Sequence, residues 1–178
     1  MTRLVLCRHA EEGNAAQAGE LAAALAELPL EAVYTSPLRR AVLTAEAVAA
    51  VHQLDPIEVV DLREIEFGEV DGLAFDQYPT ELQTDLLSRP LSVRFPGGET
   101  YAELRDRVCR SLGQIATAHD DQVVAVVTHA GPIRAALSEW LGVSDEALFR
   151  IDQRPASVNV VDWLDGVPLI RLVNGTRP

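Results

Sequence analysis

The run VVAVVT at residues 123–128 constrains the fold more than any other part of the sequence. It is shorter than a typical helix, and four of its six residues are Val, a β-branched residue that favours strands. A strand that is apolar on both faces needs cover on both faces, as in a parallel sheet flanked by helices. We therefore expect 123–128 to be a central, fully buried strand.

Three further short runs predict strands at residues 3–8, 32–35 and 57–60. Near the C-terminus, VNVVDW at 158–163 and PLIRLV at 168–173 are separated by a short connection that contains Asp-Gly. Asp-Gly is a strong signal for a tight turn between antiparallel strands, so the last two runs predict a hairpin.

Helical spacing of apolar residues occurs between these runs. It predicts a helix at 19–28 and another that has Ser36 as its N-cap and Pro37 at its first position, and that ends near His52. Thr100 and Glu103 form a capping box at the start of a third helix. A fourth helix is expected to begin at Pro132 and to end before Gly142.

The order of these elements predicts an α/β three-layer sandwich, with a mostly parallel central sheet, helices on both faces and a C-terminal hairpin. The 178 residues show no internal repeat and no linker, so we expect a single domain over residues 1–178. Between Asp61 and Pro96 the pattern weakens to a long excursion with one short helix, and long excursions of this kind are commonly functional.

The charge composition excludes several classes of protein. The chain has 15 basic and 27 acidic residues, a net charge of −12, which disfavours nucleic acid and membrane surfaces as partners. All of the basic residues are Arg. Without Lys the chain cannot form a Schiff base and has neither the P-loop lysine nor the protein-kinase lysine.

The cysteines and the N-terminus indicate where the protein works. Cys7 and Cys109 form no CxxC and are expected to be small buried hydrophobic residues. The apolar run at 4–6 is too short for a signal peptide or a membrane span, so we expect a cytoplasmic protein. The sequence leaves its oligomeric state open between monomer and homodimer.

Two of the four histidines follow predicted strands directly. His9 comes after the first strand and His129 after the central one. In an open parallel sheet, ligands bind outside the carboxyl ends of the strands, so these two side chains could meet in one site. The alternative is that each is only a core or capping histidine. His52 and His119 are expected to be surface residues.

Arginines at the same edge of the sheet indicate that the site binds an anionic ligand. Arg8 precedes His9, and Arg40 lies one turn into the helix after the second strand. A guanidinium group can donate two parallel hydrogen bonds to two oxygens of one phosphate. Arg39, Arg63 and Arg134 are instead expected to form surface ion pairs.

A carboxyl group for proton transfer is expected in the acidic stretch Asp61–Asp71. We select Glu64, because it follows the third strand most closely while leaving room for the chain to turn back. The other acidic residues of this stretch are expected to be solvated.

Five motifs in order resemble those of the histidine phosphatase superfamily, the phosphoglycerate mutase-like clan, over nearly the whole chain. They are LCRHAE at 6–11, YTSPLRRA at 34–41, LREIEFGEVDG at 62–72, PGGET at 96–100 with Arg107, and THAG at 128–131. The third motif is most similar to broad-specificity and α-ribazole-phosphate phosphatases.

The resemblance implies a phosphomonoesterase that acts on small phosphorylated metabolites without a metal or another cofactor. His9 would become phosphohistidine; Arg8, Arg40 and His129 would hold the phosphoryl oxygens; and Glu64 would protonate the leaving oxygen. Two arginines beside His9 oppose its protonation, which keeps its lone pair free for attack.

The sequence departs from the family pattern near the substrate. Ala10 and Ala130 stand where the motifs have glycine, and Ala130 would therefore line the substrate pocket. The segment between His9 and the first helix is short, and Asn14 stands in for the family's substrate-binding asparagine.

Three alternatives remain open at this point. The chain could be a degenerate member that binds a phosphorylated ligand or protein without turnover. It could be a phosphoglycerate mutase, although mutases typically have longer chains. It could also be a metal hydrolase with His9 and His129 as ligands.

Overall fold

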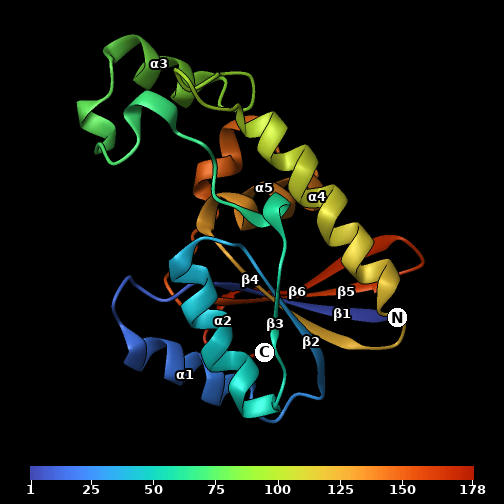
Figure 1. The fold of residues 1–178 in the computed structure, drawn as a ribbon. Coiled ribbons are helices and arrows are strands. Elements are labelled where there is room, and N and C mark those ends of the chain that lie inside the picture. Colours follow the sequence, from blue (N-terminus) through green and yellow to red (C-terminus); the bar gives the residue numbers. More distant parts are fainter.

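The computed structural model describes residues 1–178 and contains one six-stranded sheet in the order β3-β2-β4-β1-β5-β6 (Figure 1). The strands are β1 (Thr2–Arg8), β2 (Leu30–Thr35), β3 (Pro56–Glu58), β4 (Val123–Thr128), β5 (Val158–Leu164) and β6 (Val167–Gly175). The first four strands are parallel to one another, whereas β5 pairs antiparallel with β1 and with β6. β4 lies between β1 and β2 and is buried, as its apolar run predicts.

Helices cover both faces of the sheet (Figure 1). They are α1 (Ala15–Leu25), α2 (Arg39–His52), α3 (Thr80–Ser88), α4 (Tyr101–Ala118) and α5 (Ala130–Leu141). Alternate residues of β1 point to opposite faces: Leu4 and Leu6 pack with α4 and α5, while Val5 and Cys7 pack with α1 and α2. The predicted three-layer α/β fold with its C-terminal hairpin is confirmed.

The chain between β3 and α4 leaves the sheet and forms a lobe around α3 (Figure 1). Single 3-10 turns occur at Val60–Leu62, Gly68–Val70 and Phe75–Gln77, and the short helix predicted for this excursion is α3. The base of the lobe joins the body because Leu62 and Ile65 are buried in the same core as α4. The residues that follow β3 are therefore held against α4.

Several predicted boundaries are wrong. α1 begins at Ala15 instead of residue 19, because the Asn14 side chain caps it by accepting a hydrogen bond from the backbone N–H of Gln17. α2 begins at Arg39 with Leu38 as the N-cap, so Ser36 does not cap it. α5 begins at Ala130, two residues before Pro132.

The third strand was also predicted too long. β3 contains only Pro56–Glu58, and a 3-10 turn begins at Val60. This strand lies at the edge of the sheet, where it pairs with β2 alone.

Other local predictions are confirmed. The side chains of Thr100 and Glu103 cap α4 reciprocally, and Gly142 ends α5 in the left-handed conformation with φ of 61°. No helix is both long enough and apolar enough to cross a bilayer.

Candidate active site

Three neighbouring parallel strands bring residues from distant parts of the sequence to one edge of the sheet. His9 follows β1, His129 follows β4 and Ser36 follows β2. The ladder continues beyond the strands, because the backbone N–H of His9 donates to Thr128 O at 2.9 Å and that of Ser36 donates to Val127 O at 3.0 Å. The rings of His9 and His129 meet edge to face, with centroids 4.9 Å apart.

His9 is held with one ring nitrogen free of a proton. Its Nδ1 lies 2.6 Å from Ala10 O, and since a carbonyl only accepts, Nδ1 carries the hydrogen. Nε2 accepts a hydrogen bond from Arg40 Nε at 3.2 Å. Burial lowers the pKa of His9 to about 4, and the charges of Arg40 and Arg8 add to this effect. The imidazole is therefore neutral at pH 7, with a lone pair on Nε2.

His129 is fully buried. Its Nε2 lies 2.8 Å from the hydroxyl of Ser36, while its Nδ1 has no hydrogen-bond partner in the protein. Burial holds the pKa of His129 well below its usual value, and the charges of Arg40 and Arg8 act in the same direction. This histidine is also neutral at pH 7.

Arg8 is the last residue of β1, and its guanidinium is anchored by the loop before β5. NH1 donates to Gln153 O at 2.6 Å. Its Nε is buried and has no partner in the protein. Burial lowers the pKa of Arg8, and the neighbouring charge of Arg134 adds to this effect.

Arg40 and Arg39 differ in position although they are adjacent in sequence. Arg40 is half-buried against His9, whereas Arg39 is exposed. Thr44 lies one turn after Arg40 in α2, and its hydroxyl accepts a hydrogen bond from the backbone N–H of Ala10 at 3.1 Å. Thr44 thus joins α2 to the residue that follows His9.

Glu64 is brought to the same edge by the chain that leaves β3. Its carboxyl accepts from the backbone N–H of Ile65 at 2.9 Å and from that of Gly131 at 3.3 Å, two residues after His129. Burial raises the pKa of Glu64, although both backbone hydrogen bonds and the charges of Arg40 and Arg8 oppose the shift. Among the other acidic residues of Asp61–Asp71, Asp61 is half-buried, and Glu66, Glu69 and Asp71 are exposed.

The remaining predicted residues lie at the rim or away from the site. Asn14 is exposed and its amide oxygen caps α1, while Ala130 is a buried first residue of α5. Substrate contact by either residue stays a prediction. His52 and His119, expected to be surface residues, are partly exposed, and His119 Nε2 lies 2.9 Å from the hydroxyl of Tyr34. Arg134, predicted to form a surface ion pair, donates instead to Ile151 O.

Sequence reasoning missed two contacts of the site. Ser36 was predicted as a helix cap, but its hydroxyl contacts His129. Gln153, whose backbone anchors Arg8, is buried and its amide side chain pairs with Asn159 at 2.9 Å. A buried Gln paired with a buried Asn has no local pattern, because the two are brought together by the loop before β5.

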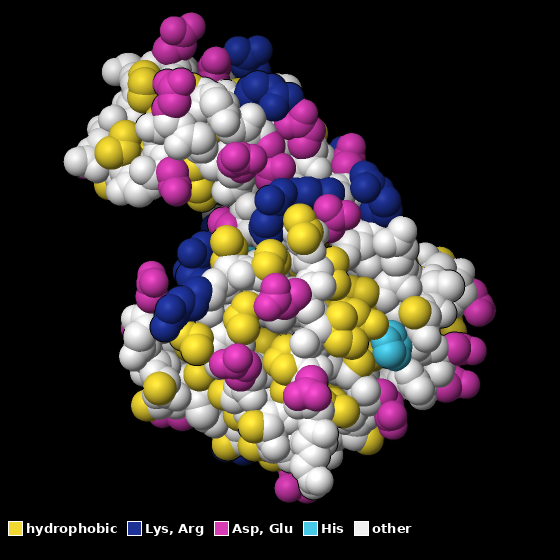
Figure 2. Space-filling view, viewed as in Figure 1, with side chains coloured by type: hydrophobic (Ala, Val, Ile, Leu, Met, Phe, Trp, Pro, Cys, Tyr) yellow, Lys and Arg dark blue, Asp and Glu magenta, His cyan; other side chains and the backbone are white.

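Two hollows open beside Arg40. One of about 460 Å³ is lined by Ala10–Ala15 together with residues of α2, and the other, of about 380 Å³, is lined by Leu38 and residues 63–68. Figure 2 shows the indentation between the α3 lobe and the body of the molecule, with arginine side chains along its border. No group of three His, Cys, Asp or Glu side chains is arranged to hold a metal ion.

Comparison with known proteins shows what this arrangement is similar to. Residues 4–176 match the histidine phosphatase superfamily, branch 1. Phosphoserine phosphatase 1 of Hydrogenobacter thermophilus is 31% identical, over 90% of this chain and 86% of that protein. The bifunctional protein Rv2228c of Mycobacterium tuberculosis is 34% identical over 83% of this chain, which spans only 41% of that relative's length.

The fold is shared with solved structures at lower identity. YhfR of Bacillus stearothermophilus superposes with a TM-score of 0.89 and 22% identity, over 98% of both chains. At this identity the likeness concerns the fold alone.

Proposed function

The chain belongs to the histidine phosphatase superfamily, branch 1, and on that premise we propose that it is a metal-independent phosphomonoesterase that acts through phosphohistidine. Its substrates would be small phosphorylated metabolites. Phosphoserine is the first to test, because the relative from Hydrogenobacter thermophilus is named a phosphoserine phosphatase.

One observation carries the proposal: beside the neutral His9, two buried nitrogen atoms lack hydrogen-bond partners. Arg8 Nε and His129 Nδ1 are both buried without a hydrogen bond in the protein. When the Ser36 hydroxyl donates to His129 Nε2, Nδ1 carries a hydrogen and becomes a donor. A buried donor without an acceptor costs about 1–3 kcal/mol, so a ligand rich in oxygen atoms is favoured here.

The first chemical step would use His9 as the nucleophile. Nε2 attacks phosphorus, a nitrogen–phosphorus bond forms, and the bond from phosphorus to the ester oxygen breaks. Arg8 and Arg40 offset the negative charge on the phosphoryl oxygens, which is the role that positive groups have in phosphoryl transfer. Glu64, whose pKa is raised by burial, donates its proton to the leaving oxygen, and the alcohol departs.

The second step would reverse the proton movement. A water molecule attacks the phosphorus atom of phosphohistidine, and Glu64, now a carboxylate, takes its proton. The nitrogen–phosphorus bond breaks, and inorganic phosphate and neutral His9 result. The same carboxyl group thus serves as acid and then as base, and it ends each cycle protonated.

The test is to trap the intermediate. Native protein mixed with a phosphate ester labelled in the phosphoryl group should retain label that is stable in base and labile in acid. His9→Ala should retain none and should not turn over the ester, while His119→Gln, a histidine outside the site, should behave as the native protein. Label on the His9→Ala protein would overturn the assignment of the nucleophile, and binding of phosphate esters without any turnover would favour a degenerate binding protein instead.

A further inference from the structure

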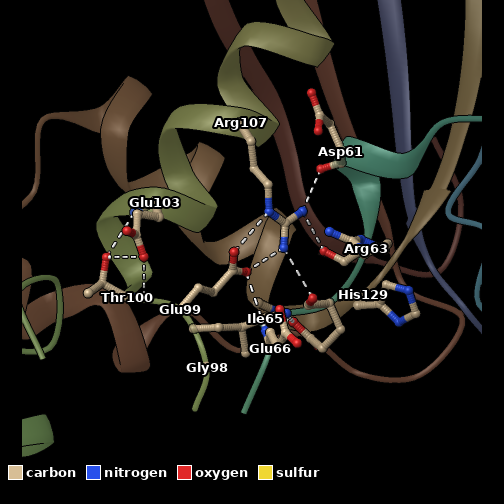
Figure 3. Close-up of polar contacts among 12 residues, drawn as sticks. Asp61, Arg63, Ile65, Glu66, Gly98, Glu99, Thr100, Glu103, Arg107 and His129 are labelled. Atoms are coloured by element: carbon tan, nitrogen blue, oxygen red, sulfur yellow. Dashed lines mark hydrogen bonds and ion pairs between the residues drawn. The ribbon is translucent and has the colours of Figure 1, made fainter. Parts of the chain in front are cut away.

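Arg107 of α4 uses all of its hydrogen-bond donors on one short segment and on Glu99 (Figure 3). NH1 donates to Asp61 O at 2.6 Å and to Arg63 O at 2.9 Å, and NH2 donates to Glu64 O at 3.1 Å. Nε and NH2 also donate to the two carboxylate oxygens of Glu99. An Arg side chain has five N–H donors, and here each of them has an acceptor.

Glu99 extends the same set of contacts to the far side of Glu64. Its carboxylate accepts from the backbone N–H of Glu66 at 3.3 Å, and its own N–H donates to Glu66 O at 3.0 Å. Gly98 lies so close that a Cβ built on it would be 2.1 Å from Glu66 O. The segment 61–66 is therefore held at both ends, by Arg107 before Glu64 and by residues 98 and 99 after it.

The pair that does this is itself held rigidly. The side chain of Arg107 is 11% exposed and that of Glu99 is 16% exposed, so water competes little with their ion pair. Arg107 projects from the middle of α4, and Leu104 and Val108 on either side of it are fully buried in the core. A support of this kind fixes the position of a neighbouring group better than a flexible loop could.

We infer that Arg107, together with Glu99, is a positioning residue that fixes the Glu64 carboxyl against Gly131 N–H, two residues after His129. The role of Glu64 as an acid rests on the proposed function, whereas its placement by Arg107 and Glu99 does not. Arg107 does not touch the reacting atoms; it acts through the backbone carbonyl groups of residues 61, 63 and 64.

Lysine at position 107 separates geometry from charge. Arg107→Lys keeps the positive charge, which also contributes to the lowered pKa of His129, but three donors on one nitrogen cannot replace the planar guanidinium group. Glu99→Gln is a second, milder variant, since it retains one oxygen acceptor. Arg110→Lys is the matched control: Arg110 lies one turn further along α4, is 61% exposed, and reaches only the Asp61 carboxylate, at 4.0 Å.

The first readout needs no turnover. The pKa of Glu64 is measured by ¹³C NMR on carboxyl-labelled protein, and the charged or titratable groups near it are Arg8, Arg40 and Tyr101. Arg107→Lys and Glu99→Gln should lower the pKa of Glu64 towards its ordinary value, because a released segment admits water. Arg110→Lys should leave this pKa as in the native protein. An unchanged pKa of Glu64 in Arg107→Lys would overturn the inference.

The second readout is the dependence on the leaving group. Misplacing a reacting group can cost on the order of 100-fold in rate, so Arg107→Lys should lower kcat for an alkyl phosphate roughly tenfold to 100-fold. Its kcat for 4-nitrophenyl phosphate, whose leaving oxygen needs little protonation, and its KM for both esters should change far less. In a Glu64→Gln background, Arg107→Lys should add no further loss. Equal losses on both esters would overturn the positioning role.

The two readouts distinguish the inference from the function on which it rests. If the native protein hydrolyses neither ester but Arg107→Lys lowers the pKa of Glu64, the proposed function fails and the placement by Arg107 is supported. If the native protein is active but neither readout responds to Arg107→Lys, the function stands and the inference fails.

Discussion

Arg40 Nε donates its hydrogen bond to His9 Nε2 at 3.2 Å, so a guanidinium group faces the nitrogen that would attack phosphorus. This contact disfavours a proton on Nε2, since two N–H groups cannot both donate into the same short gap. It also places a positive charge where the oxygen atoms of a phosphoryl group on Nε2 would lie. The same guanidinium group can therefore keep the nucleophile neutral and bind the group that it receives.

Arg40→Ala should reduce kcat/KM strongly for every phosphate ester. Removing one strong donor to a transition state costs about 3 kcal/mol, roughly a 100-fold loss. Arg39→Ala is the neighbouring control and should change kcat/KM little, because Arg39 is exposed while Arg40 contacts His9. Steady-state kinetics on one aryl and one alkyl phosphate measures both; a larger loss in Arg39→Ala would contradict the assignment.

Glu64→Gln should separate esters by their leaving groups. The amide cannot donate the carboxyl proton, so turnover of an alkyl phosphate should fall by about 100-fold or more. Release of 4-nitrophenol requires little protonation, and this ester should lose much less. Glu66→Gln changes an exposed carboxylate two residues away and should leave the ratio between the two esters as in the native protein. If Glu66→Gln, and not Glu64→Gln, selectively lost activity on the alkyl phosphate, Glu66 would be the acid.

The rate should depend on pH through two groups, because His9 must lack a proton on Nε2 and Glu64 must carry one. His9 must be neutral to attack, so kcat/KM should rise as the pH increases through its pKa of about 4. Glu64 must be protonated to assist the leaving group, so kcat/KM for an alkyl phosphate should fall as the pH increases through its raised pKa. In Glu64→Gln the decrease at higher pH should disappear while the increase near pH 4 remains. If kcat/KM of Glu64→Gln still falls at the same pH as that of the native protein, Glu64 is not the cause of the fall.

Glycines at two helical positions should respond differently to alanine. A Cβ on Gly131 would lie 2.1 Å from Glu64 Oε1, so Gly131→Ala must displace the carboxyl and should lower turnover of alkyl phosphates. Nothing lies within 4 Å of a Cβ on Gly19 in α1, and Gly19→Ala should raise the free energy of unfolding by about 0.4–1 kcal/mol. Kinetics and denaturant unfolding of both variants test this. Normal alkyl phosphatase activity in Gly131→Ala would mean that Glu64 is not held there.

Glu64 shows how far reasoning from the sequence can reach within the site. It was selected from five carboxylates only by its distance from the third strand, and the structure places it beside Gly131 N–H. Its position follows from contacts with Arg107, 43 residues away in sequence. No local pattern in Asp61–Asp71 contains that information.

The sequence by itself determined the layers of the fold and the edge at which His9 and His129 lie. Both depend on local information: alternating short apolar runs and helical periodicity predict the sheet and its cover, and the carboxyl ends of parallel strands share one edge. The Asn14 cap at the start of α1 is itself a local hydrogen bond, whereas the Ser36 hydroxyl contacts His129 from a distant part of the chain.

Only the tertiary structure decided how the site is held together. Ser36 and His129 are 93 residues apart and Arg8 and Gln153 are 145 apart, yet each pair is joined by a hydrogen bond. Such contacts form because separate elements pack on one sheet, and burial then lowers the pKa of the histidines and raises that of Glu64. Residue types alone carry neither the distance between two side chains nor the loss of water around them.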